Sequence, residues 1–186
     1  YAVAGHTLSF GAGGADVYVV KLDVSGNLQW TQTIGGSAGD YALSIVQTTD
    51  GGYAFTGSTY TYGAGLTDAY IGKLDGTGAL QWTRTVGGSQ DENPRNIIQT
   101  ADGGYAIAGW EYSFGFGFND MHVIKLDGTG NLQWSKAIGG PGIEYGYDIV
   151  QTSGGDYVGA GYTSSGGNDA ACVVKLDPSG SLLWTK

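Results

Sequence analysis

An aromatic segment in the third quarter of the chain has residue types that suit a binding surface. The segment GWEYSFGFGFND, residues 109–120, places aromatic rings beside carboxylate and amide groups. Such rings stack on the apolar faces of sugars while the polar groups bind hydroxyls. The same side chains also suit a protein contact, or packing against a neighbouring element. The candidate binding residues are Trp110, Glu111, Tyr112, Phe116, Phe118 and Tyr145.

Acidic side chains gather in two further segments, GGSQDENPRN and GGPGIEYGYD. They contribute Asp91, Glu92 and Glu144, and Ca²⁺ prefers such oxygen ligands. These residues are weak calcium candidates because their spacing is not that of a contiguous calcium loop, and a solvated acidic rim is the default interpretation. A facing pair such as Asp91 and Glu144 would also suit glycoside hydrolysis, but the sequence does not place the two at a useful separation.

Other catalytic chemistry has little support in the sequence. The two histidines, His6 and His122, are expected in a loop and in a strand, and the sequence has no metal-spaced cluster or G-x-S-x-G nucleophile motif. The single cysteine, Cys172, excludes an intrachain disulfide and is expected to be a buried, unreactive thiol. We therefore expect a protein that is not an enzyme and has no resident cofactor.

Composition narrows the class of protein further. The chain has 186 residues, of which 41% are hydrophobic and 13% charged, so it can bury a core and is not of a disordered type. Its net charge of −9 argues against nucleic acid, which needs clustered cations. No apolar run is long enough for a membrane span. The chain starts at Tyr1 without Met, and we expect a mature or excised segment.

The residues above lie on a repeated unit. KLDVSGNLQW begins at Lys21, and nearly the same ten letters recur three more times. We expect residues 1–186 to form a single domain or a segment of one. Its repeats are 1–52, 53–104, 105–156 and an incomplete 157–186. Self-similarity with a period near 50 residues is typical of solenoids and propellers.

Each repeat predicts β-strands and turns. Its apolar runs are short, rich in β-branched and aromatic residues, and bounded by Gly or Asp. The Asp-Gly pair in TTDGGY predicts a tight primed-turn hairpin. In LDVSGN, Asp accepts backbone N–H bonds and Gly takes a positive φ. The predicted turn residues are Asp23, Asp75, Asp127 and Asp177, with Gly26, Gly78, Gly130 and Gly180.

Two further side chains recur in every repeat. One tryptophan is predicted to pack between neighbouring sheets; these residues are Trp30, Trp82, Trp134 and Trp184. The lysine of KLD follows apolar residues, so we expect its stem to lie along the sheet and its ammonium to meet a carboxylate. The expected partners stand five or six residues earlier: Asp16, Asp68, Asp120 and Asp169.

Four strands in a repeat of about 50 residues are the signature of a β-propeller blade. YALSIVQT is then the innermost strand, YAFTG the second, DAYIGKLD the third and LQWTRTV the outermost. The chain holds about four blades, and the first lacks its innermost strand. A propeller closes its ring because open blade faces expose apolar surface. We expect closure by further blades of one longer protein or by self-association.

The motifs resemble those of a known group. DAYIGKLDGTGALQW, the GG pairs and the GGY strands are similar to the repeats of secreted bacterial and archaeal β-propeller proteins. The resemblance covers essentially the whole chain. It implies an extracellular or cell-surface propeller that binds a protein or glycan ligand rather than catalysing a reaction, and it assigns no functional residue. The alternatives are a structural component that assembles through open blade ends, and a glycan-active enzyme.

Overall fold

The chain forms an all-β structure. A computed structural model describes residues 1–164 and 168–186, and these residues form fifteen strands. No helix that is long and apolar enough to span a membrane occurs among them. The strands are β1 (Ala2–Thr7), β2 (Asp16–Leu22), β3 (Leu28–Ile34), β4 (Asp40–Gln47), β5 (Tyr53–Thr59), β6 (Asp68–Leu74), β7 (Leu80–Val86), β8 (Glu92–Gln99), β9 (Tyr105–Glu111), β10 (Asp120–Leu126), β11 (Leu132–Ile138), β12 (Glu144–Gln151), β13 (Tyr157–Thr163), β14 (Ala170–Leu176) and β15 (Leu182–Thr185).

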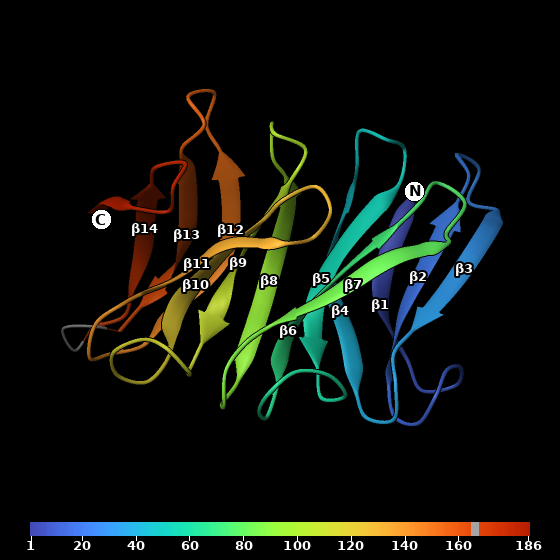
Figure 1. The fold of residues 1–186 in the computed structure, drawn as a ribbon, viewed down its shortest axis with the longest axis horizontal. Coiled ribbons are helices and arrows are strands. Elements are labelled where there is room, and N and C mark those ends of the chain that lie inside the picture. The colour runs from blue at the N-terminus through green and yellow to red at the C-terminus, as the bar shows by residue number, and fades with distance from the viewer. Residues whose placement is uncertain (165–167) are drawn as a thin grey trace.

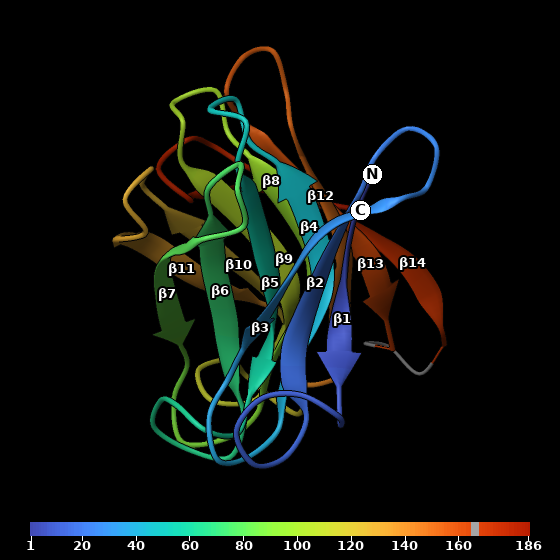
Figure 2. The same cartoon turned by 90° about the vertical axis from the view of Figure 1, so that its right-hand side faces the viewer.

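The strands build four antiparallel sheets in chain order. Three sheets have four strands, β4 to β7, β8 to β11 and β12 to β15, and the first has only β1 to β3. Each is a simple meander, and the sheets follow one another side by side (Figure 1). The outer strands β7 and β11 lie on one side of the molecule, and β4, β8 and β12 lie further from that side (Figure 2). The prediction of four propeller blades, the first without its innermost strand, is confirmed.

The two kinds of turn have the same geometry. In the LDVSGN turn, the N–H of Gly26 donates to the carbonyl of Asp23, and Gly26 has a φ of 83°. The Asp23 carboxylate accepts the N–H groups of Ser25 and Asn27. The DGG turn was predicted as a primed turn, which is wrong. In the DGG turn Gly51 has a positive φ but Asp50 does not, and Gly51 donates to Thr48, as in a type I turn followed by a left-handed Gly.

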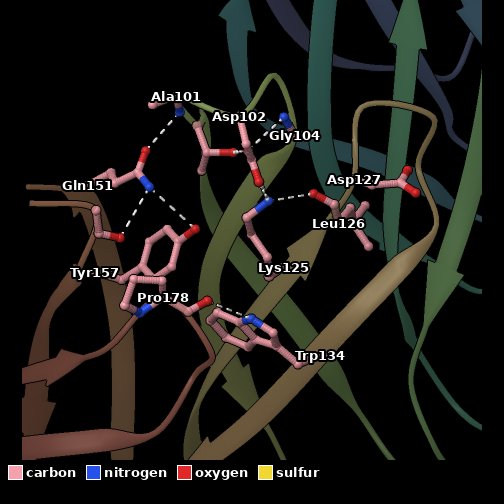
Figure 3. A network of polar contacts seen from close by, with 12 residues as sticks. Ala101, Asp102, Gly104, Lys125, Leu126, Asp127, Trp134, Gln151, Tyr157 and Pro178 are labelled. Carbon is pink, nitrogen blue, oxygen red and sulfur yellow. Dashed lines mark hydrogen bonds and ion pairs between the residues drawn. The ribbon is translucent and has the colours of Figure 1, made fainter.

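The lysine of KLD binds the aspartate of the DGG turn. Lys125 Nζ lies 2.9 Å from the Asp102 carboxylate and also donates to the carbonyl of Leu126 (Figure 3). Lys73 pairs in the same way with Asp50. The prediction that the partner precedes the lysine on its own strand is wrong, because the carboxylates at those positions lie at the opposite end of the strand. Asp16, Asp68 and Asp120 lie beside the first glycine of the connection to the next blade, and Asp169 accepts a hydrogen bond from the Tyr162 hydroxyl.

The recurring tryptophan packs on the next blade. The ring of Trp82 meets Tyr105 edge-on, with centroids 5.7 Å apart. Trp82 also lies against the left-handed Gly130, where an added Cβ would approach the indole to 3.0 Å. The same pairs recur at the other two junctions between blades. Gly130 is therefore required twice, by its positive φ and by the tryptophan of the preceding blade.

The core consists of apolar layers between consecutive blades. At one junction, Ile71 of β6 packs with Ile107 of β9 and Ile124 of β10. The outgoing face of the last blade has no neighbour in this chain. Trp184, the counterpart of Trp82, is 40% exposed there. At the other end, Tyr1 is 72% exposed, whereas its counterpart Tyr105 is buried.

Candidate functional site

One end of the blades carries the segments that differ between repeats. The loops that join second to third strands (8–15, 60–67 and 112–119) meet the connections between blades (35–39, 87–91 and 139–143). The N–H of Tyr112, for example, donates to the carbonyl of Asp91 at 2.9 Å. These loops extend along the lower edge in Figure 1, and we call this end the loop face. The recurring DGG and KLD turns lie at the other end.

The structure separates the six candidate binding residues into two groups. Trp110 and Glu111 were assigned to a loop, which is wrong, because both end strand β9. Trp110 is partly buried and meets Tyr145 edge-on at 5.5 Å. Glu111 is fully buried, and its Oε2 accepts the N–H groups of Ser113 and Phe114 at 2.6 Å. These three candidates are therefore parts of the scaffold, and Glu111 shapes the start of the loop.

The other candidates belong to an exposed aromatic group on the loop face. Phe116 is 81% exposed and Phe118 is 60% exposed. Four further members of this group were not among the six candidate residues. All seven rings are at least 44% exposed: Phe10, Tyr60, Tyr62, Tyr112, Phe114, Phe116 and Phe118. Rings of this size normally lose much of their area to burial, so their concentration at one end indicates a contact surface.

A second surface is formed by the innermost strands. Each has a β-bulge at the same place, so that one residue has no partner in the ladder. The extra residues are Leu43, Arg95 and Tyr147, and all three side chains are exposed. A bulge redirects the side chain that it carries, and bulges are common next to functional sites. The three blades thus present a different side chain from one shared position.

A pocket of about 280 Å³ opens between two of these bulges. Its lining comes from three blades: His6, Tyr41, Leu43, Ser58, Tyr60, Thr67, Asn93 and Arg95. His6 was predicted in a loop, which is wrong, since it lies in β1 and meets Tyr41 edge-on at 4.9 Å. Tyr41 also meets Tyr60. The sequence does carry a signal for this site that was missed. His6, Ser58 and Trp110 occupy the same position in successive repeats, so this position changes while the motifs around it hardly change.

The three calcium candidates are not brought together. Glu92 and Glu144 lie at different junctions, where each accepts the N–H of a glycine, Gly88 and Gly140, at 2.8 Å. Asp91 instead accepts a hydrogen bond from the hydroxyl of Thr67. Within residues 1–164 and 168–186, no group of three or more His, Cys, Asp or Glu side chains is placed to hold a metal ion. The pair Asp91 and Glu144 is likewise divided between two junctions.

Blade β8 to β11 departs from its neighbours in a row of buried carboxylates. In the adjacent blades the middle position is a threonine, and Thr163 donates to Glu144 at 2.8 Å. Glu111 takes this position, in register with both Glu92 and Asp120. One oxygen each of Glu92, Glu111 and Asp120 has no partner among the described residues.

Burial and the neighbouring charges change the acidity of this row. Burial, together with Glu111 and Glu144, raises the pKa of Asp120 to about 6. Burial also raises the pKa of Glu92, with a further contribution from Asp68 and Glu111. A buried carboxylate without a countercharge favours its protonated form. This row lies behind the loop that carries Phe116 and Phe118, so it is part of the scaffold of the loop face.

The remaining titratable candidates are core residues. His122 is 3% exposed, and burial lowers its pKa to about 4, so it is neutral at physiological pH. Cys172 is buried and free, and burial raises the pKa of its thiol. A raised thiol pKa lowers the thiolate fraction and so the reactivity.

Comparisons with known proteins name no family for this chain. No protein-family model and no curated protein matches the chain. A solved structure described as "Crystal structure of the eukaryotic initiation factor" is similar, with 10% identity and a TM-score of 0.44. The match covers 100% of this chain and 52% of that one, so the chain spans about half the length of that structure. The class, a four-blade β-propeller segment, rests on the four sheets and their strand order.

Proposed function

We propose that this chain is a non-catalytic recognition or adhesion module that binds a protein or a glycan through its loop face. The observation that carries the proposal is the group of seven exposed aromatic rings there. Binding energy concentrates in such aromatic anchors, and loops on a rigid scaffold commonly hold binding residues. The resemblance to secreted propeller repeats supports an extracellular or cell-surface location.

The test compares ligand binding of the chain with that of a Phe116→Ala/Phe118→Ala variant on a glycan array. These two side chains are preferable to Trp110, because truncation of Trp110 would also remove packing on Tyr145. The matched control is Leu132→Ala, an exposed apolar side chain on the outer strand β11. Circular dichroism checks the folding of all proteins.

The expected result is binding by the native chain and the Leu132 control, and loss of binding in the double phenylalanine variant. Equal binding by all three proteins would contradict a site at these rings. An array without any signal would remove the glycan reading and leave a protein contact. Either result leaves the scaffold assignment intact, because that rests on the sheets.

The end faces favour a second candidate, a structural component that assembles through its blades. A tryptophan and a tyrosine pair at every junction between blades, as Trp82 and Tyr105 do. At the two ends of the chain the equivalent residues, Trp184 and Tyr1, are exposed. Light scattering tests this candidate: a dimer or larger assembly that becomes monomeric in Trp184→Ala supports it. A monomer over the whole accessible concentration range contradicts it.

A further inference from the structure

We propose that the pocket beside Arg95 binds a carboxylate-bearing sugar, the acidic unit of a glycan. This inference rests on the proposed recognition function and adds a ligand class and a second site. The pocket adjoins the loop face, with which it shares Tyr60, and it differs in chemistry because the innermost strands add a permanent cation, Arg95. The residues that form it occupy positions where the repeats diverge.

Arg95 supplies the charge. It is the extra residue of the β8 bulge, where the adjacent blades have Leu43 and Tyr147, and its side chain is exposed. No hydrogen bond or ion pair joins its guanidinium to another residue that the structure describes. The planar guanidinium donates two parallel hydrogen bonds to a carboxylate, which gives both affinity and orientation.

Five of the seven other lysine and arginine side chains have a partner among the described residues, and one of them, Lys21, lies over the Tyr53 ring. Lys73, Lys125 and Lys175 form ion pairs with turn aspartates, and Arg84 lies over Trp82 and donates to main-chain carbonyls. With a net charge of −9, the chain as a whole repels anions. An anionic ligand therefore has to be bound locally, and Arg95 is placed in a pocket where it can do so.

Asn93 supplies an oriented donor on the same strand. The hydroxyl of Ser58 donates to Asn93 Oδ1 at 3.3 Å, which leaves Asn93 Nδ2 without a partner among the described residues. Nδ2 can then donate to a ligand hydroxyl or carboxylate. Asn93 stands where the sister blades have Tyr41 and Tyr145, so this junction alone among the three within the chain replaces a ring by an amide.

Aromatic rings from the preceding blade also line the pocket. Tyr41 and Tyr60 meet edge-on with centroids 6.3 Å apart, and Tyr60 is 58% exposed. Rings held in this way can stack on the apolar face of a sugar, and the nearby His6 adds a further polar group. A pocket with one cation, one free amide donor and adjacent rings matches an acidic sugar better than a neutral one, which would leave the guanidinium without a countercharge.

The experiment is a calorimetric titration of the chain with an oligogalacturonate and with a neutral oligogalactan of the same length. We expect the acidic oligosaccharide to bind at least about tenfold more tightly, since hydrogen bonds to charged groups give this magnitude. In Arg95→Gln that preference should disappear. Arg95→Lys should keep part of it, because the charge remains but the two-pronged geometry is lost.

The control is Arg84→Gln, which removes another exposed arginine, from the outer strand β7. Its preference for the acidic ligand should equal that of the native chain. Equal affinity for the two oligosaccharides, or an unchanged preference in Arg95→Gln, would overturn the inference. If the loop-face variant still abolishes glycan binding in that case, the proposed function stands and only the ligand class at Arg95 fails.

Discussion

Replacement of Asp120 by Asn should remove a pH dependence of stability that the native chain shows between about pH 4 and pH 6. Asp120 is 2% exposed, lies in register with Glu111 and faces Glu144 across the connection between blades. Its pKa is raised from 3.8 to about 6, chiefly by burial and then by the two glutamates. Asparagine has the same shape and cannot ionise.

The sign follows from proton binding. Between the unfolded pKa and the raised folded pKa, the native state binds more protons than the unfolded state, so the free energy of unfolding falls as pH rises. The shift is about two pKa units, and each unit corresponds to about 1.36 kcal/mol. The penalty of ionised Asp120 is therefore about 3 kcal/mol at pH 7 and almost absent at pH 4.

Urea unfolding, followed by tryptophan fluorescence, measures the free energy of unfolding at several pH values between 4 and 7. The stability of Asp120→Asn relative to the native chain should rise by about 3 kcal/mol across that range. The control is Asp127→Asn, an exposed turn carboxylate whose pKa is lowered by hydrogen bonds to Asn131 and Thr129, and its difference should be flat above pH 5. A constant difference between Asp120→Asn and the native chain would refute the argument.

Three further predictions concern the scaffold and use the same unfolding assay. Trp82→Ala should lower the free energy of unfolding by about 3–5 kcal/mol. Trp184 has no neighbouring blade in this chain, so Trp184→Ala should cost about 1 kcal/mol or less. Equal losses would contradict the packing of Trp82 on the next blade. Gly130→Ala should cost about 1–2 kcal/mol, because an L-residue resists its φ of 83° and the new Cβ meets Trp82; a neutral effect would show that neither constraint matters. The Thr48 hydroxyl and then Lys73 lower the pKa of Asp50 to about 2, so Asp50→Asn should lower the free energy of unfolding at neutral pH, by less than about 1 kcal/mol because this carboxylate is half exposed. The loss of stability should disappear as pH falls from about 4 to about 2. A loss that grows in acid would have the wrong sign.

The sequence determined the blade because its repeated letters satisfy local requirements. Strand alternation, the Asp23 turn and the left-handed Gly26 depend on residues a few positions apart, so each can be read from ten consecutive residues. Four copies of one unit then predict four copies of one structure, and neighbouring sheets can bury their apolar faces only against each other. The strand order in the sheets follows from short connections between consecutive strands.

The tertiary structure decided which side chains meet across these elements. Lys125 reaches the turn aspartate Asp102 rather than Asp120, because the partner was determined by the direction of the strand and not by distance along the chain. Trp110 and Glu111 were the most suggestive residue types in the sequence, yet they are the last two residues of strand β9 and belong to the scaffold. The pocket at Arg95 combines residues from three blades and a bulge, and no short stretch of sequence encodes where such distant side chains converge.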